Sequence, residues 1–285
     1  MVSPGLLAII VTFVAFSISL TLERRVATLA GTLRGSVLVL FFGLLPLLVF
    51  FSISNFNLSA FEIFLSLASG ILFAVGYVLY YKSLETEQIS NTTGVGLIQP
   101  ALLLVFSIVV LKESITFHQT LGGIIIFVGV ILIITNNKFE LNRKLIPALV
   151  ANISWAGYWI IASYAILSSQ QVGAVLLISR FVGFVITTLL FAIYLRNDKI
   201  PQIKSNLVLP LLAVAIAAGL LDGLGNATFG FVIQYGVLSL GSIFVAGLPL
   251  SVTLLAYFVY KERLTKLQGL GMMVAVIGAL VIAAF

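Results

Sequence analysis

An aspartate and an asparagine lie deep inside a long apolar stretch of this 285-residue chain, where charged side chains are costly. Asp222 lies about 15 residues into the stretch 207–233, roughly 22 Å along a helix that rises about 1.5 Å per residue. Asn226 follows one helical turn later, so the two side chains share a face. A carboxylate in this position could bind the amine of a substrate or carry a proton. A structural ion pair, or a hydrogen bond to neighbouring backbone, is the alternative.

Two arginines also lie within apolar stretches. Arg180 is about eight residues into the stretch 172–195, about 12 Å along its helix. Its guanidinium could bind an anionic group or neutralise Asp222. Alternatively, the long side chain could reach back to the lipid headgroups. Arg34 occupies the corresponding place in an earlier stretch and is a weaker candidate for the same role.

Polar and aromatic side chains mark two further stretches. Asn152, Trp155 and Trp159 share one helical face, where an aromatic ring can flank a substrate while polar groups orient it. Tyr77 and Tyr80 offer the same chemistry on an earlier stretch. Ordinary packing between helices explains the first set equally well, and tyrosines near a membrane surface often serve as anchors.

Two prolines interrupt apolar stretches at equivalent places. Pro100 and Pro249 each remove a helix hydrogen bond and free a carbonyl group. Broken helices commonly border the substrate site of membrane carriers, although a kink can also serve packing alone. Gln99, which precedes Pro100, is included in the candidate substrate pathway.

Four glycines fall into two pairs with the same spacing. The members of each pair are seven residues apart and therefore share a helix face. They predict close contact between helices, either within one molecule or in a homodimer. The pairs are Gly122 with Gly129 and Gly271 with Gly278.

The amino-acid composition indicates whether the helices that carry these residues lie in water or in a lipid bilayer. The chain is 61% hydrophobic and 8% charged, with a mean hydropathy of +1.23, so one aqueous core cannot hide its apolar surface. Apolar stretches of about 20 residues, each long enough to cross a bilayer as a helix, recur between short polar breaks. We predict an all-α integral membrane protein with ten transmembrane helices over 4–22, 27–53, 61–81, 93–111, 119–135, 145–167, 172–195, 207–233, 239–260 and 266–284.

The sequence contains none of the usual residue patterns of an enzyme active site. The chain has no cysteine, and its only histidine, His118, lies in a predicted loop, so neither a thiolate site nor a metal site of usual spacing is expected. No phosphate-binding G-x-x-x-x-G-K-[ST] motif occurs to drive an ATP-powered pump. We therefore expect no catalysis, no cofactor and no bound metal.

The two halves of the chain repeat one another. Residues 100–133 align without a gap on 249–282, and the matched positions include residues that apolar composition would not supply. Five predicted helices per repeat is an odd number, so the repeats enter the membrane in opposite senses and form an inverted repeat. We place the repeats at 1–140 and 141–285. The repeated pairs Lys112-Glu113 and Lys261-Glu262 are predicted at helix ends, where a cap or surface pair is expected.

Basic residues gather in the loops on one side of the predicted membrane. The loops after the first, third, fifth, seventh and ninth helices hold 12 of the 15 Lys and Arg residues, and the other loops hold only Lys112. By the positive-inside rule the basic side is cytoplasmic, which puts both termini outside. The basic loops on the cytoplasmic side then account for the net charge of +6, so this charge does not indicate a nucleic-acid partner.

These repeats resemble the EamA-like branch of the drug/metabolite transporter superfamily. The resemblance covers the whole chain and is carried by Pro100 and Pro249, by the Lys-Glu pairs, and by the Gln-x-x-Gly spacing that follows each pair. An arginine opening the second helix of each half, Arg34 and Arg180, also fits. The first helix departs from the family pattern because it carries no tryptophan. Many relatives keep their termini in the cytoplasm, whereas the loop charges here argue for the reverse.

The resemblance implies a secondary carrier for small polar metabolites such as amino acids, often an exporter, in the plasma membrane. A central cavity between the repeats would hold the substrate, lined by the third, fourth, eighth and ninth helices. A channel, or a carrier of sugars or organic anions, is the alternative. The expected partners are the substrate, the lipid bilayer, and a proton or counter-substrate. Proton coupling would most simply use Asp222.

Overall fold

The computed structural model describes residues 4–52, 56–99, 102–103, 117–134, 142–197, 203–235 and 238–284, and every regular element in these ranges is a helix. In the first half these are α1 (Pro4–Ala30), α2 (Thr32–Ser52), α3 (Ala60–Thr86), α4 (Ile89–Gly94), the 3₁₀ turn η1 (Val95–Leu97) and α6 (Phe117–Ile134). In the second half they are η2 (Arg143–Leu145), α7 (Ile146–Ser169), α8 (Val172–Asn197), α9 (Ser205–Gln234), α10 (Leu238–Tyr260) and α11 (Lys266–Ala284).

The distribution of side chains is that of a membrane protein. Six of the described helices are long and apolar enough to cross a bilayer. Large apolar side chains face outward, such as Val49 and Leu209, which are 64% and 77% exposed, while many polar side chains lie inside. This confirms the predicted all-α integral membrane class. The predicted fourth helix is placed only at its start, in α4 and η1, because much of 93–111 lies outside the described residues.

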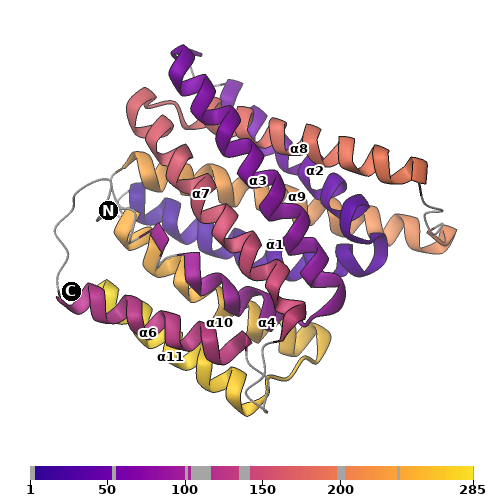
Figure 1. The fold of residues 1–285 in the computed structure, drawn as a ribbon. Coiled ribbons are helices and arrows are strands. Elements are labelled where there is room, and N and C mark those ends of the chain that lie inside the picture. The colour runs from indigo at the N-terminus through magenta and orange to yellow at the C-terminus, as the bar shows by residue number, and fades with distance from the viewer. Residues whose placement is uncertain are drawn as a thin grey trace.

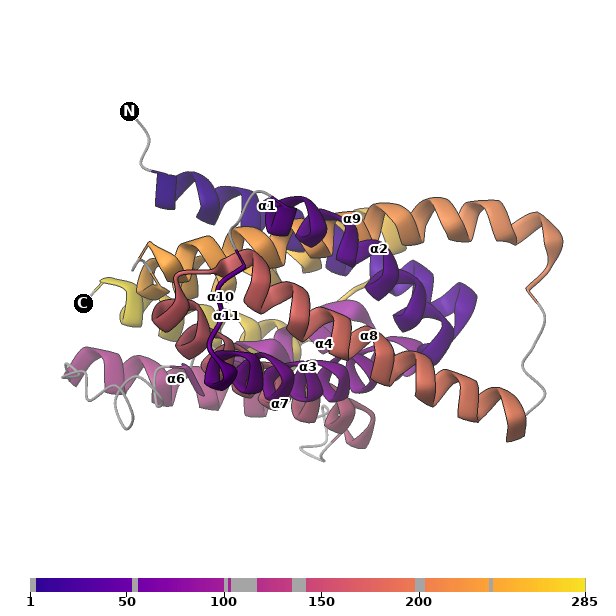
Figure 2. The ribbon, with the colours of Figure 1, turned by 90° about the horizontal axis from the view of Figure 1, so that it is seen from above.

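The helix contacts have a twofold pattern. Equivalent helices of the two halves pack directly on each other, namely α2 on α8, α4 on α10 and α6 on α11. The other major contacts occur in matched pairs. Helix α1 packs on α9, and in the same way their counterparts in the other half, α7 and α3, pack on each other. Exchanging the two halves therefore maps the contact pattern onto itself, as expected for ten helices in two inverted repeats. Figure 2 shows the start of α1 and the end of α11 at the same end of the bundle, as an even number of crossings requires.

The pair α6 and α11 lies side by side at one edge of the molecule (Figure 1). All four glycines predicted for helix packing meet in this one contact, within the monomer. A Cβ atom on Gly129 would lie 2.6 Å from the Gly271 carbonyl oxygen, and one on Gly278 would lie 2.6 Å from that of Gly122. The small residues thus allow the two backbones to approach closely.

The first helix is longer than its apolar stretch. The sequence predicts its end at Leu22, but α1 continues for about two more turns to Ala30. Gly31 then adopts a left-handed conformation with φ of 78°, which glycine tolerates without a Cβ clash, and α2 begins at Thr32. Glu23 consequently lies on a helix and points into the protein.

Glu262 connects the two repeats. It follows α10, and its carboxylate accepts hydrogen bonds from the backbone N–H groups of Ile89 and Ser90, both at 3.1 Å, at the start of α4. The Ser90 hydroxyl donates to it as well, at 2.9 Å. The carboxylate therefore satisfies amides that a helix N-terminus leaves without partners.

Candidate functional site

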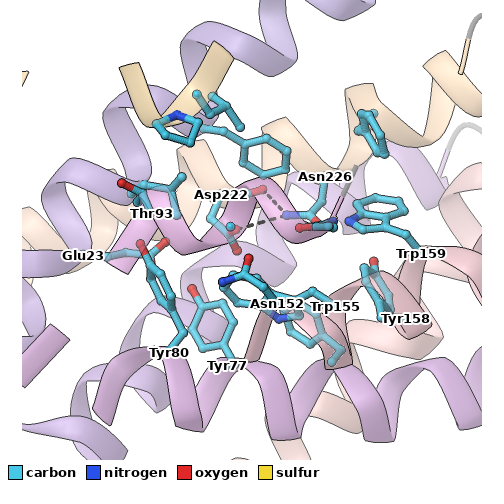
Figure 3. A pocket seen from close by; sticks show the side chains of 18 of the residues that line it. Glu23, Tyr77, Tyr80, Thr93, Asn152, Trp155, Tyr158, Trp159, Asp222 and Asn226 are labelled. Carbon is cyan, nitrogen blue, oxygen red and sulfur yellow. Dashed lines mark hydrogen bonds between the residues drawn. The ribbon is translucent and has the colours of Figure 1, made fainter. Parts of the chain in front are cut away.

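A cavity is lined by residues of both repeats (Figure 3). The first repeat lines it with α1, α3, α4 and η1, and the second repeat with α7, α9 and α10. The space between atoms amounts to about 920 Å³, including the part that is open to its surroundings.

A buried ion pair fixes one side of the cavity. Arg180 of α8 donates from Nη2 to Oδ2 of Asp222 on α9, and Asn226 donates to the other carboxylate oxygen, Oδ1, at 3.1 Å. The guanidinium also lies 4.1 Å from the centre of the Phe73 ring. Arg180 is only 2% exposed, so its side chain does not reach back to the headgroups. Both oxygens of Asp222 have partners and its charge is neutralised.

Glycines allow α9 to place Asp222 against its neighbours. A Cβ atom on Gly223 would lie 2.2 Å from the carbonyl oxygen of Gly43 on α2, so the two helices touch backbone to backbone. Because α2 also packs on α8, this close crossing brings Asp222 within reach of Arg180.

Aromatic rings form the opposite wall. Tyr80 of α3 lies 5.0 Å from Trp155 of α7, between ring centres. Trp159 lies 4.7 Å from Tyr158 and 4.6 Å from Phe229. The Trp155 Nε1 and Tyr158 hydroxyl are buried and make no hydrogen bond to the described residues. Aromatic faces with polar tips of this kind can hold an organic group and a polar or cationic group together.

Most of the residues predicted for a substrate pathway come together here. Those that line the cavity are Asp222, Asn226, Tyr77, Tyr80, Asn152, Trp155, Trp159, Gln99 and Pro249. Arg180 joins them through Asp222. Arg34, half-buried in the first turn of α2, does not line the cavity, and Pro100 lies outside the described residues.

Sequence reasoning missed Glu23, Tyr158 and Thr93, which also line the cavity. Glu23 was overlooked because the apolar stretch ends before it, which places it in a predicted loop. A polar spacing that continues along one helix face through Thr12, Ser19 and Glu23 could have revealed it. Within the described ranges, no three His, Asp or Glu side chains come close enough to hold a metal ion.

Comparison with known proteins gives the same architecture. The model of the EamA-like transporter family matches residues 3–135 and 143–284, which together cover nearly all of the chain. A solved crystal structure superimposes with a TM-score of 0.67 over 97% of this chain and 95% of that one, at 15% identity, which shows the fold alone.

Two curated relatives are transporters without an assigned substrate. An uncharacterized transporter of Synechocystis sp. is 27% identical over 230 residues, covering 73% of this chain and 61% of that protein. An uncharacterized transporter of Clostridium kluyveri is 27% identical over 139 residues, covering 47% of this chain and 45% of that protein. The matched regions thus span about half to three fifths of these relatives' lengths.

Proposed function

We propose that this chain, which belongs to the EamA-like transporter family, is a secondary carrier of small polar metabolites such as amino acids. Membership of the family makes the chain a multi-pass membrane transporter. The carrier mechanism, the substrate class and the direction of export are our proposals.

The observation that carries the proposal is the chemistry of the cavity. Charged and polar groups, Asp222, Arg180 and Asn226, lie opposite aromatic rings from both repeats. Such a site suits a substrate with a charged amine or carboxylate and an organic side chain, because polar groups orient the charged part and rings flank the remainder. A sugar would use the polar side chains and leave the ion pair without a role.

The twofold packing supports alternating access. Both repeats contribute helices to the lining of the cavity, and the helix contacts map onto each other when the halves are exchanged. Rocking of one repeat against the other would open the cavity to each side of the membrane in turn. We place the protein in the plasma membrane with both termini outside.

A thermal-shift screen of the purified protein tests the substrate class. Amino acids, sugars, nucleotides and organic phosphates would each be added in detergent, since a compound that binds only the folded state raises its unfolding temperature. We expect a saturable shift with an amino acid or amine that is lost in Asp222→Asn. A shift confined to anions and lost on replacing Arg180 would instead favour a carrier of phosphates or carboxylates.

A further inference from the structure

Glu23 is a second buried carboxylate in the cavity wall, and it has no cation in contact. It lies on α1 with 1% of its surface exposed. Its Oε2 atom makes no hydrogen bond to the described residues, and Oε1 lies 3.1 Å from the Ser19 hydroxyl. A carboxylate so placed is costly in a membrane protein unless it is neutral or takes a cation.

The hydrogen bonds of Ser19 indicate which of these applies. The Ser19 hydroxyl lies 2.8 Å from the carbonyl oxygen of Ala218 as well as close to Glu23. A hydroxyl has one hydrogen, and a backbone carbonyl can only accept. Because that hydrogen is shared between the Ala218 carbonyl, at the shorter distance, and the Glu23 carboxylate, Ser19 gives Glu23 only a weak hydrogen bond. One weak donor offsets little of the cost of an ionised carboxylate in this place, which favours the protonated form.

The charges around Glu23 lead to the same conclusion. Three tyrosines of α3 (Tyr77, Tyr80 and Tyr81), Arg180 of α8 and Asp222 of α9 interact with it electrostatically. Arg180 is already paired with Asp222, so an ionised Glu23 would leave one uncompensated negative charge in the protein interior.

The other neighbours of α1 bring no second cation into contact with Glu23 among the described residues. Tyr260 of α10 donates its hydroxyl to the Thr21 carbonyl at 2.6 Å. On the side of α2, Gly35 packs near Val26. Arg24, the next residue of α1, interacts electrostatically with Tyr80, and no ion pair joins it to Glu23.

We propose that Glu23 is the site at which the cavity exchanges a proton for the ammonium group of an amine substrate. This inference rests on the proposed carrier function and names the group that would couple it to protons. The Glu23 O–H bond breaks, its proton leaves to water, and the resulting carboxylate accepts N–H donors from the ammonium. The charge in the cavity is the same before and after. The rings of Tyr77, Tyr80 and Trp155 present faces that attract a cation.

The intrinsic tryptophan fluorescence of the protein can be used to measure binding in the cavity. It has two tryptophans, Trp155 and Trp159, and both line the cavity. Intrinsic fluorescence therefore reports on cavity occupancy without a label. Suitable probes are phenethylamine, which carries an ammonium group, and 2-phenylethanol, which has a similar shape and no charge.

The test is a fluorescence titration of the purified full chain with both probes at several pH values. Releasing one proton per bound amine makes the affinity for phenethylamine rise by up to about tenfold per pH unit while Glu23 is protonated. We expect this rise in the wild type, and an affinity for 2-phenylethanol that does not change with pH. Glu23→Gln should lose the pH dependence and bind phenethylamine weakly. Glu62→Gln, in the capping box at the start of α3, is the matched control and should behave as wild type.

Binding of 2-phenylethanol checks that Glu23→Gln keeps its cavity; if that variant does not fold, the pH slope of the wild type decides. The role of Glu23 is overturned by phenethylamine binding that does not depend on pH, by an unchanged slope in Glu23→Gln, or by binding of the alcohol alone. Any of these results, with solute transport intact, leaves the proposed function standing. Absence of both binding and transport of any solute class contradicts the carrier itself.

Discussion

At the scale of single residues, the pair of Arg180 and Asp222 makes the strongest prediction about stability. Arg180→Met would leave Asp222 buried without its cation, which typically costs about 3–5 kcal/mol of unfolding free energy. The double variant Arg180→Met/Asp222→Asn should recover much of that loss because it removes the uncompensated charge. Thermal unfolding in detergent measures both. A double variant less stable than Arg180→Met alone would contradict this account of the pair.

Single residues also show how far the sequence could be interpreted. Asp222 and Arg180 were identifiable because each stands within a long apolar stretch, where any charge needs a reason. Their pairing was one of several options, since depth along two helices does not fix which side chains meet. Glu23 was missed because the apolar stretch ends at Leu22, before this residue. The helix itself continues to Ala30 and ends where Gly31 adopts a left-handed conformation.

At the scale of helices, the contact between α6 and α11 depends on glycine at its crossing points. A Cβ atom on Gly129 would lie 2.5 Å from that of Ala275, whereas one on Gly269 of the same pair would meet nothing within 4 Å. Gly129→Ala should therefore destabilise the protein by about 1–3 kcal/mol through overpacking. Gly269→Ala should be neutral or stabilising by up to about 1 kcal/mol, because alanine favours a helix.

Thermal unfolding of the two alanine variants compares the same chemical change at a closed and an open site. Equal effects of Gly129→Ala and Gly269→Ala would show that close packing of α6 on α11 contributes little.

The N-terminus of α4 depends on a carboxylate from the other repeat. Glu262→Ala removes the acceptor of three hydrogen bonds, from Ile89 N, Ser90 N and Ser90 Oγ. We expect a loss of about 1–2 kcal/mol in unfolding free energy, as for other helix caps. Glu262→Gln should lose less, because its amide oxygen still accepts. A ranking of the two unfolding temperatures in the opposite order would contradict the cap.

Helix positions were largely predictable because apolar length determines a membrane crossing. The cap itself was only partly predictable. The repeated Lys-Glu pairs indicated helix ends, but the sequence does not say that Glu262 would cap a helix of the other repeat, since that contact depends on how the repeats pack.

At the scale of the whole molecule, the loop charges predict that both termini face outward. The chain has no cysteine, so single-cysteine variants need no altered background. Asn57 precedes α3 and Asn206 lies in the first turn of α9; both are exposed. In intact cells an impermeant maleimide should label Asn57→Cys, while Asn206→Cys should react only after permeabilisation. The reverse pattern would place the termini in the cytoplasm.

The two-repeat architecture was the most predictable feature, because an odd number of helices per repeat fixes inversion without knowledge of any contact. The cavity could be anticipated between the repeats. Its lining by α1 and α7, which are not among the helices that the resemblance implied for the cavity, depends on packing that sequence does not specify.

Counterflow in liposomes tests the central claim, that the cavity between the repeats is the substrate site of a carrier. Liposomes with the purified protein would be loaded with an unlabelled amino acid and given a trace of the labelled compound outside. We predict a transient, saturable accumulation of label for at least one amino acid or amine. Asn152→Leu, similar in volume and lacking the polar group that Asn152 brings to the cavity, should weaken it. Flux that rises linearly with concentration and never overshoots, or accumulation unchanged in Asn152→Leu, would contradict the claim.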